Sequence, residues 1–207
     1  MLREVEHSGR KEQAAPAYFM GVSELRKTGE QAVCTTVRLQ VRAAAGDRRR
    51  GWLSAGPHCI PVALGRGGIR ANKREGDGAT PRGRFRLVRL WWRPDRGPRP
   101  QTLLPVRPIR PTDAWCEDPA DRRYNQPIRL SRGATGDRLW RGDHLYDLII
   151  ELDHNTRPRI AGRGSAVFIH VARPALAPTA GCVALNAKAL RRLVNCLSSR
   201  VRIEIHA

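Results

Sequence analysis

Alternation of apolar and polar residues predicts that most of the regular structure in this chain is strand. The alternation is clear at residues 37–42, where Val37, Leu39 and Val41 are separated by Arg38 and Gln40. The same period returns at the C-terminus, in residues 201–205. Apolar and β-branched runs predict further strands at 59–64, 83–91, 146–152 and 166–170.

Only one segment has a convincing helical period. Asn186 can cap it, and apolar residues then recur at the spacing of one helix face, at Leu190, Leu193, Val194 and Leu197. The fold class predicted from the pattern is therefore mainly β, a β-rich α+β fold with few helices. At 207 residues, with 41% hydrophobic content, 19 glycines and 15 prolines, one core is expected.

Two regions lack this periodicity. Residues 1–36 are expected to be a poorly ordered leader, followed by one domain over 37–207. The apolar piece at 14–22 is short, contains Pro and Gly and lacks an A-x-A exit, so it is not an evident signal peptide. Residues 91–139 are rich in Pro, Arg and aromatic residues, and the run 115–125 is expected to form a long loop or lid.

Candidate chemistry lies near the C-terminus, where His170 ends a predicted strand and Cys182 follows twelve residues later. An imidazole can take the proton of a thiol and leave a strong nucleophile for acyl transfer. The amides of Gly181 and Cys182 are the nearest candidate donors to the resulting oxyanion. The positive end of the helix predicted after Cys182 is expected to stabilise a thiolate. The alternative is that Cys182 is a small buried hydrophobic residue.

Two blocks of sequence carry a family resemblance. Residues 179–183 read Thr-Ala-Gly-Cys-Val and follow the strand that ends in His170, and residues 76–85 read Gly-Asp-Gly-Ala-Thr-Pro-Arg-Gly-Arg-Phe. In this order they resemble the active-site signature and the Thr-Pro-x-Gly-x-Phe segment of the L,D-transpeptidases (YkuD domain). The resemblance spans roughly residues 37–205.

The resemblance implies a mixed-sheet sandwich and a cysteine acyl-enzyme that acts on stem tetrapeptides of peptidoglycan. The product would be a 3-3 crosslink or a 1-3 crosslink from L-Ala to diaminopimelate, with L,D-carboxypeptidase activity when water is the acceptor. A carbapenem would acylate the same thiol. A cysteine peptidase or amidase and a non-catalytic basic polymer-binding protein are the alternatives.

The chain departs from the family at one position. Members usually carry Arg or Asn two residues after the cysteine, where this chain has Ala184. Arg173 is the nearest basic residue that can take over binding of a substrate carboxylate, with a solvated loop residue as the alternative. The loop from His170 to Cys182 is also shorter than usual, which suggests a branch with a different acceptor preference.

Further substrate contacts are predicted more weakly. Thr179, Tyr124, Asn125 and Tyr146 are the candidates. Trp115 is expected to seal the core under the predicted loop. His154 is expected to be structural.

Charge and cysteine content add limits. The formal net charge is +19, but the basic residues are mostly arginines scattered along the chain, which favours an arginine-biased composition and an acidic polymer such as peptidoglycan over nucleic acid. The five cysteines form no CxxC pair, so no metal site and no cofactor are expected. No apolar run is long enough to span a membrane. The resemblance implies the periplasm or cell envelope, with the cytoplasm as the alternative, and leaves the oligomeric state open.

Overall fold

A three-stranded meander begins the described part of the chain. In this computed structural model, which describes residues 38–131 and 135–207, the meander consists of β1 (Leu39–Ala44), β2 (Asp47–Ala55) and β3 (His58–Ala63). The alternation of β1 buries Leu39 and Val41, as predicted. β2 was not predicted, because the arginines of its first half mask the alternation that buries Gly51 and Leu53 in its second half.

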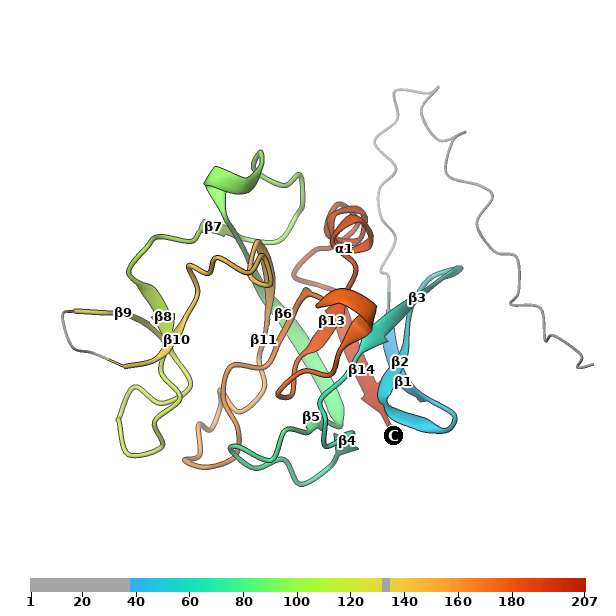
Figure 1. Cartoon of the computed structure of the whole chain (residues 1–207), viewed down its shortest axis with the longest axis horizontal. Helices are drawn as coiled ribbons and strands as arrows, with labels where there is room; N and C mark the ends of the chain where they lie inside the picture. Colours follow the sequence, from blue (N-terminus) through green and yellow to red (C-terminus); the bar gives the residue numbers. More distant parts are fainter. Residues whose placement is uncertain (1–37, 132–134) are drawn as a thin grey trace, which may run out of the picture. The chain divides into compact units, whose positions relative to one another are not determined.

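These strands belong to a nine-stranded mixed sheet of order β11-β12-β13-β3-β2-β1-β14-β6-β7 (Figure 1). β1 runs parallel to β14, β12 to β13, and β6 to β7, while the other neighbours are antiparallel. The remaining strands of this sheet are β6 (Gly83–Trp92), β7 (Val106–Pro108), β11 (Leu148–Leu152), β12 (Phe168–Val171), β13 (Val183–Leu185) and β14 (Arg202–His206).

The sheet folds over, so that two halves face each other as a sandwich. β11 also pairs with β6, which joins the two halves along one edge. The enclosed core takes one face of each strand, including Leu53, Leu87, Ile150, Ile169 and Ile203. The predicted β-rich mixed-sheet sandwich is therefore confirmed, and the pairing that closes its edge was not foreseen.

The predicted helix is α1 (Ala187–Val194), with Asn186 accepting a hydrogen bond from the Lys188 amide at 2.9 Å. Its apolar face buries Leu190, Leu193 and Val194 in the core. β13 lies between Cys182 and this helix, so the helix does not start just after the cysteine. The expectation that its positive end stabilises the thiolate is wrong, because dipole effects are confined to the first turn.

The segment predicted as a loop contains a second, three-stranded sheet. β8 (Asp113–Trp115) pairs with β9 (Pro127–Arg129) and β10 (Asp137–Arg138), and only the stretch between β8 and β9 is a loop. Such short strands leave no period for sequence analysis to detect. Trp115 seals a second apolar cluster, where it packs edge-to-face on Trp91 and Phe168.

The remaining elements are short. They are β4 (Ile69–Arg70), β5 (Thr80–Pro81) and two turns of 3-10 helix, η1 (Pro94–Arg96) and η2 (Pro174–Leu176). The described residues belong to one compact unit, 34–207. The predicted leader, residues 1–36, lies outside the described residues.

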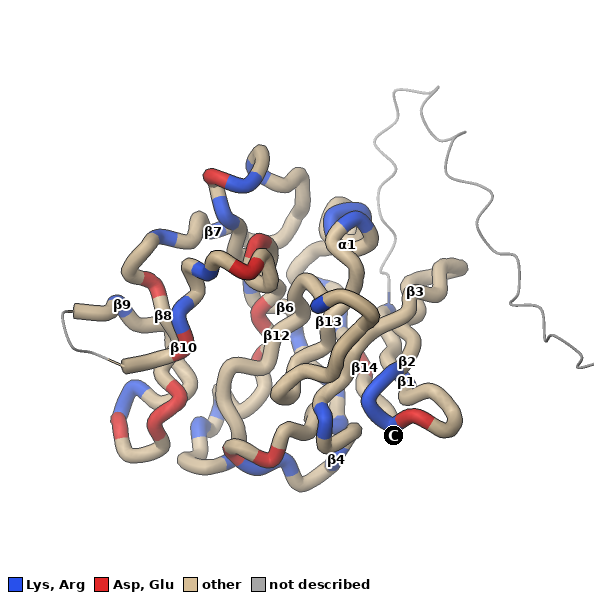
Figure 2. Tube along the Cα trace, in the orientation of Figure 1, with Lys and Arg blue, Asp and Glu red and all other residues tan. Residues whose placement is uncertain are grey.

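Lysine and arginine residues are spread over many of these elements, although β3, β11, β12 and β13 contain none, and a run of arginines lies at the start of β2, just after its turn from β1 (Figure 2).

Candidate active site

His170 lies in β12, where its side chain faces the cleft and is 6% exposed. Its Nδ1 lies 2.8 Å from the carbonyl oxygen of Val171, which can only accept. Nδ1 therefore carries the proton, and Nε2 keeps a free lone pair. The ring packs edge-to-face on Tyr146, with 5.4 Å between centroids. This anchoring fixes the tautomer that a general base needs.

Cys182 immediately precedes β13, which runs parallel to β12. Ala184 is level with His170, so Cys182 lies next to Phe168 and on the same face of the sheet as the imidazole. The thiol donates to the carbonyl oxygen of Ala166 at 3.2 Å and accepts from the amide of Phe168 at 3.4 Å. The two predicted catalytic side chains thus come from β12 and from the residue just before β13, and both face one cleft.

Burial keeps both side chains neutral in this state. Burial raises the pKa of Cys182 to about 12, and burial together with Arg141 and Arg173 lowers the pKa of His170 to about 4. The sequence suggested a site that presents a thiolate. The structure corrects this, because the thiol is 8% exposed and is hydrogen-bonded to a carbonyl rather than to the imidazole.

The turn before Cys182 is held by Thr179. Its hydroxyl donates to the carbonyl oxygen of Cys182 at 2.7 Å and accepts from the Gly181 amide at 3.1 Å. The Gly181 amide, one of two predicted oxyanion donors, is therefore already engaged. Gly181 has φ +148°, and a Cβ there would lie 2.8 Å from the carbonyl oxygen of Ala79, so only glycine fits.

The block at residues 76–85 packs behind this turn. The Thr80 hydroxyl accepts from the Gly65 amide at 2.9 Å, and Gly65 forms a bridge with Thr179. Lys73 is 6% exposed and pairs with Asp77 at 2.6 Å. The two blocks that carry the family resemblance are thus joined in space.

The opposite side of the cleft is charged. Tyr146 donates its hydroxyl to Asp137 at 2.7 Å, and Arg141 lies 3.5 Å from the same carboxylate. Burial raises the pKa of Asp137. Desolvation, with Asp137 and Glu75 nearby, raises the pKa of Glu117 to about 7. This wall therefore concentrates carboxylates that take up protons more readily than usual.

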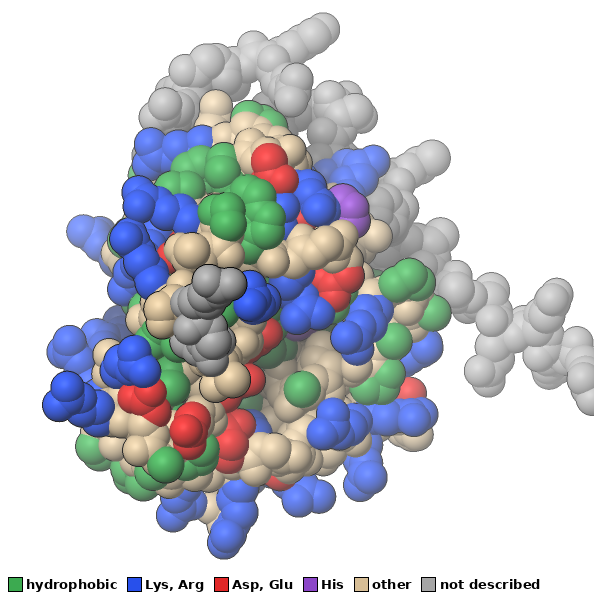
Figure 3. Space-filling view, turned by 60° about the vertical axis from the view of Figure 1, so that its left-hand side comes forward, with side chains coloured by type: hydrophobic (Ala, Val, Ile, Leu, Met, Phe, Trp, Pro, Cys, Tyr) green, Lys and Arg blue, Asp and Glu red, His purple; other side chains and the backbone are tan. Residues whose placement is uncertain are grey.

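The two walls enclose a cleft of about 810 Å³. Figure 3 shows a hollow on this face, with acidic side chains along one side and basic side chains along the other. The lining includes Arg66, Lys73, Glu75, Glu117, Asp137, Arg141, Tyr146, Ser165, His170, Arg173, Thr179, Gly181 and Cys182.

The sequence that forms this site matches a known family. Residues 44–205 match the YkuD family, the L,D-transpeptidase catalytic domain. The chain belongs to the YkuD family. A solved L,D-transpeptidase from Mycobacterium smegmatis is similar at 12% identity and a TM-score of 0.38, over 83% of this chain and 59% of that chain. No curated protein sequence matches.

The position that departs from the family lies at the centre of this YkuD domain. Ala184 is level with His170, is 1% exposed and leaves the cleft without a polar side chain there. Arg173, the predicted replacement, is exposed and lines the cleft. Arg141 lines it as well, with its guanidinium 5.0 Å from the centre of the Tyr146 ring. Both arginines therefore line the cleft of this YkuD domain, and one of them, Arg141, is paired with Asp143.

Two predicted substrate contacts do not line the cleft. Asn125 is 5% exposed, and its side chain accepts from Trp115 and the Ala166 amide while donating to the carbonyl oxygens of His154 and Asn155. Tyr124 is 3% exposed and donates its hydroxyl to Glu75, which itself lines the cleft. Both residues are fully used in holding the loop between β8 and β9. Thr179 and Tyr146, in contrast, do line the cleft.

Sequence analysis missed Lys73, Asp137, Glu117 and Arg141. None of them belongs to a periodic segment or to the two family-like blocks, and only their position in the folded chain assigns them to the cleft. His154 is structural as expected, since its Nε2 lies 3.0 Å from the carbonyl oxygen of Arg163.

Within residues 38–131 and 135–207, no helix has the length and apolar character needed to cross a membrane. In the same ranges, no group of three or more His, Cys, Asp and Glu side chains is arranged to hold a metal ion.

Proposed function

We propose that this YkuD domain is a peptidoglycan L,D-transpeptidase that forms an acyl-enzyme on Cys182 with stem tetrapeptides. The observation that carries the proposal is the placement of Cys182 and His170 on one face of adjacent parallel strands, at the base of the cleft. A cysteine peptidase would give hydrolysis products without crosslinks, and a polymer-binding protein would give no product.

In the first half-reaction, the Cys182 thiol passes its proton to Nε2 of His170 while sulfur bonds to the carbonyl carbon of the third residue of the tetrapeptide. The oxyanion is stabilised by the Cys182 amide, because the Gly181 amide is engaged by Thr179. Collapse breaks the peptide bond. The leaving amine of D-alanine takes the proton back from His170, which leaves a thioester.

In the second half-reaction, the amine of another stem attacks the thioester and gives its proton to His170. The new amide is the crosslink, and the thiol regains its proton. Water in place of the amine gives a tripeptide, which is L,D-carboxypeptidase activity. A side-chain amine of diaminopimelate gives a 3-3 crosslink and an L-alanine amine a 1-3 crosslink.

The charges of the cleft support this assignment. Arg173 suits a free carboxylate of the donor, and the carboxylates of Asp137 and Glu117 suit an amine that arrives as an ammonium ion. Because the substrate is outside the inner membrane, the proposal requires the protein to act in the cell envelope.

The Cys182 thiol must break its hydrogen bond to the carbonyl oxygen of Ala166 before it can pass its proton to His170. Since both groups are neutral at rest, proton transfer is expected only when substrate occupies the cleft and displaces water. The resting state protects the thiol from small oxidants.

The test is incubation of the purified protein with muropeptides, followed by mass spectrometry of the products. Cys182→Ala is expected to abolish crosslinks and tripeptide formation and to remove the mass shift produced by a carbapenem. Cys116→Ala is the matched control, because Cys116 is also buried and free but lies outside the cleft. Turnover that survives in Cys182→Ala, or a wild-type product with hydrolysis at another bond, contradicts the proposal.

A further inference from the structure

A second hollow, of about 650 Å³, lies at the turn between β1 and β2. Its charged lining consists of Asp47, Arg48, Arg49 and Arg66, which leaves an excess of positive charge. We call these four residues the arginine groove. The turn carries adjacent basic residues in Figure 2, beside the acidic residue that precedes them.

The arginines of this turn differ in their partners. Arg49 and Arg50 both pair with Asp47, at 3.1 and 3.8 Å. Among the described residues, neither Arg48 nor Arg66 forms an ion pair or a side-chain hydrogen bond, although both are exposed. Two guanidinium groups in the same hollow are thus free to bind an anion.

The aliphatic parts of the Arg66 and Arg48 side chains lie against Gly78 and Gly68. A Cβ at Gly78 would lie 2.7 Å from Cγ of Arg66, and a Cβ at Gly68 would lie 3.2 Å from Cδ of Arg48. A side chain at either glycine position would displace the aliphatic part of the neighbouring arginine. The glycines therefore let both arginines lie flat against the backbone, which restricts them before any ligand binds.

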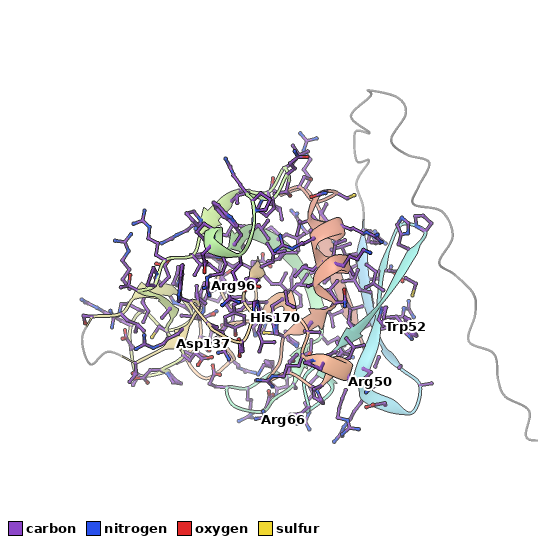
Figure 4. The ribbon with its side chains drawn as sticks, turned by 45° about the horizontal axis from the view of Figure 1, so that its top comes forward. Arg50, Trp52, Arg66, Arg96, Asp137 and His170 are labelled. Atoms are coloured by element: carbon purple, nitrogen blue, oxygen red, sulfur yellow. The ribbon has the colours of Figure 1, made fainter. Side chains whose placement is uncertain are left out.

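The arginine groove is continuous with the catalytic cleft. Arg66 lines both hollows, and its amide donates to the carbonyl oxygen of Thr179 at 3.0 Å, in the turn that carries Cys182. Arg50 donates to the carbonyl oxygen of Ala175 at 2.9 Å, in the loop between His170 and Cys182. Figure 4 shows Arg66 and Arg50 toward the same end of the molecule.

We propose that the arginine groove binds carboxylates of the peptidoglycan polymer outside the stem peptide that reacts at Cys182. The inference rests on the proposed function. If one stem peptide of the polymer occupies the cleft, the rest of the polymer must lie on the protein surface beside the cleft. Neighbouring stems repeat free carboxylates at short intervals, which matches two free guanidinium groups beside the cleft. The groove would hold the polymer while donor and acceptor stems exchange.

The test is co-sedimentation of the full chain with purified sacculi. Arg48→Gln/Arg66→Gln is expected to weaken binding about 5-fold, since two exposed charge pairs are lost. Arg122→Gln/Arg200→Gln is the control with the same change of net charge, because both residues are exposed and line neither hollow. Equal binding by the two double variants overturns the proposal.

Chemical treatment of the sacculi identifies the anion. Carbodiimide amidation of the stem carboxylates is expected to abolish the difference between the two double variants. Hydrofluoric acid, which removes phosphodiester-linked polymers, is expected to preserve it. Loss of the difference after hydrofluoric acid alone overturns the carboxylate assignment.

Turnover separates this proposal from the proposed function. Arg48 lines only the arginine groove, so Arg48→Gln is expected to use a soluble tetrapeptide like wild type and to crosslink sacculi more slowly than Arg122→Gln. If Arg48→Gln and Arg122→Gln crosslink sacculi at equal rates, the proposal that the arginine groove binds the polymer is wrong. If the wild type fails to use tetrapeptide at all, the proposed function fails, while the sedimentation result still decides whether the groove binds carboxylates.

Discussion

The wall of the cleft that holds Cys182 and the wall that holds Asp137 are built in different ways. On the first wall, main-chain pairing of β12 with β13 fixes the relative positions of His170 and Cys182. On the second wall, side-chain contacts place the charged groups, as where Tyr146 binds Asp137. Pairing within the nine-stranded sheet thus positions His170 and Cys182, whereas Asp137 lies on the short strand β10 of the second sheet and is held by a side-chain contact.

The two walls also differ in how burial affects their titration. On the first wall, burial favours the neutral thiol and the neutral imidazole, so no charge is present until reaction begins. On the second wall, the carboxylates of Asp137 and Glu117 have raised pKa values; Asp137 has Tyr146 and Arg141 as partners, and Glu117 is exposed. Changes to the first wall are therefore expected to affect chemistry most, and changes to the second wall to affect it least.

The largest effect is expected from His170→Asn, which removes the proposed base. Turnover on tetrapeptide should fall about 10²- to 10⁴-fold, and the loss of activity that protonation of His170 causes in the wild type as pH falls toward 4 should be absent from the variant. The measurement is the pH dependence of turnover in both proteins. A variant whose pH profile matches the wild type would exclude His170 as the base.

The next effect is on stability and follows from the same residue. The pKa of His170 is lowered from 6.5 to about 4 in the folded protein, so the unfolded chain takes up the proton first as pH falls. Stability is fully present above pH 6.5 and is lost as pH falls toward 4, by about 3 kcal/mol.

Denaturant unfolding at pH 7 and pH 4 measures this loss. His170→Asn is the control, since it keeps every other titrating group, and its own loss over the same range should be about 3 kcal/mol smaller. The comparison uses the change with pH inside each protein, so a general destabilisation by the substitution does not enter. Equal losses in the two proteins would contradict the lowered pKa.

The sequence predicted the long strands of the nine-stranded sheet better than the short strands of the second sheet. Strands with a buried and an exposed face have a local signature, and for this reason β1, β3, β6, β11, β12 and β14 were located to within a few residues. β2 escaped because three consecutive exposed arginines, Arg48, Arg49 and Arg50, interrupt the alternation of buried and exposed positions. The short strands β8, β9 and β10 escaped because they have no period at all.

The site shows the same contrast. The sequence predicted that His170 on a strand and Cys182 after the following loop would work as a pair, and both side chains line one cleft. The protonation state was predicted wrongly, since burial by Phe168 and its neighbours comes from distant parts of the chain. Tyr124 and Asn125 were misplaced because a loop sequence does not specify which way its side chains point.

Arg173→Ala addresses the edge of the first wall. If Arg173 binds a donor carboxylate in place of the side chain missing at Ala184, the loss is about 1.5 to 3 kcal/mol, and use of tetrapeptide falls about 10- to 150-fold. The reaction of Cys182 with a small thiol reagent should not change. Arg122→Gln serves as the control for the change of net charge. If Arg173→Ala and the wild type use tetrapeptide equally well, Arg173 is a solvated loop residue and does not bind the donor.

The smallest effect is expected at Tyr146, which connects the two walls. Its ring packs on His170 and its hydroxyl donates to Asp137. Tyr146→Phe keeps the ring and removes only the hydrogen bond, so unfolding should become easier by about 1 kcal/mol, with little change in turnover. Tyr146→Leu also removes the ring, and should lower turnover because the imidazole loses its support. If Tyr146→Phe lowers turnover as much as Tyr146→Leu, the charge of the second wall acts on the chemistry directly, and the division between the two walls is wrong.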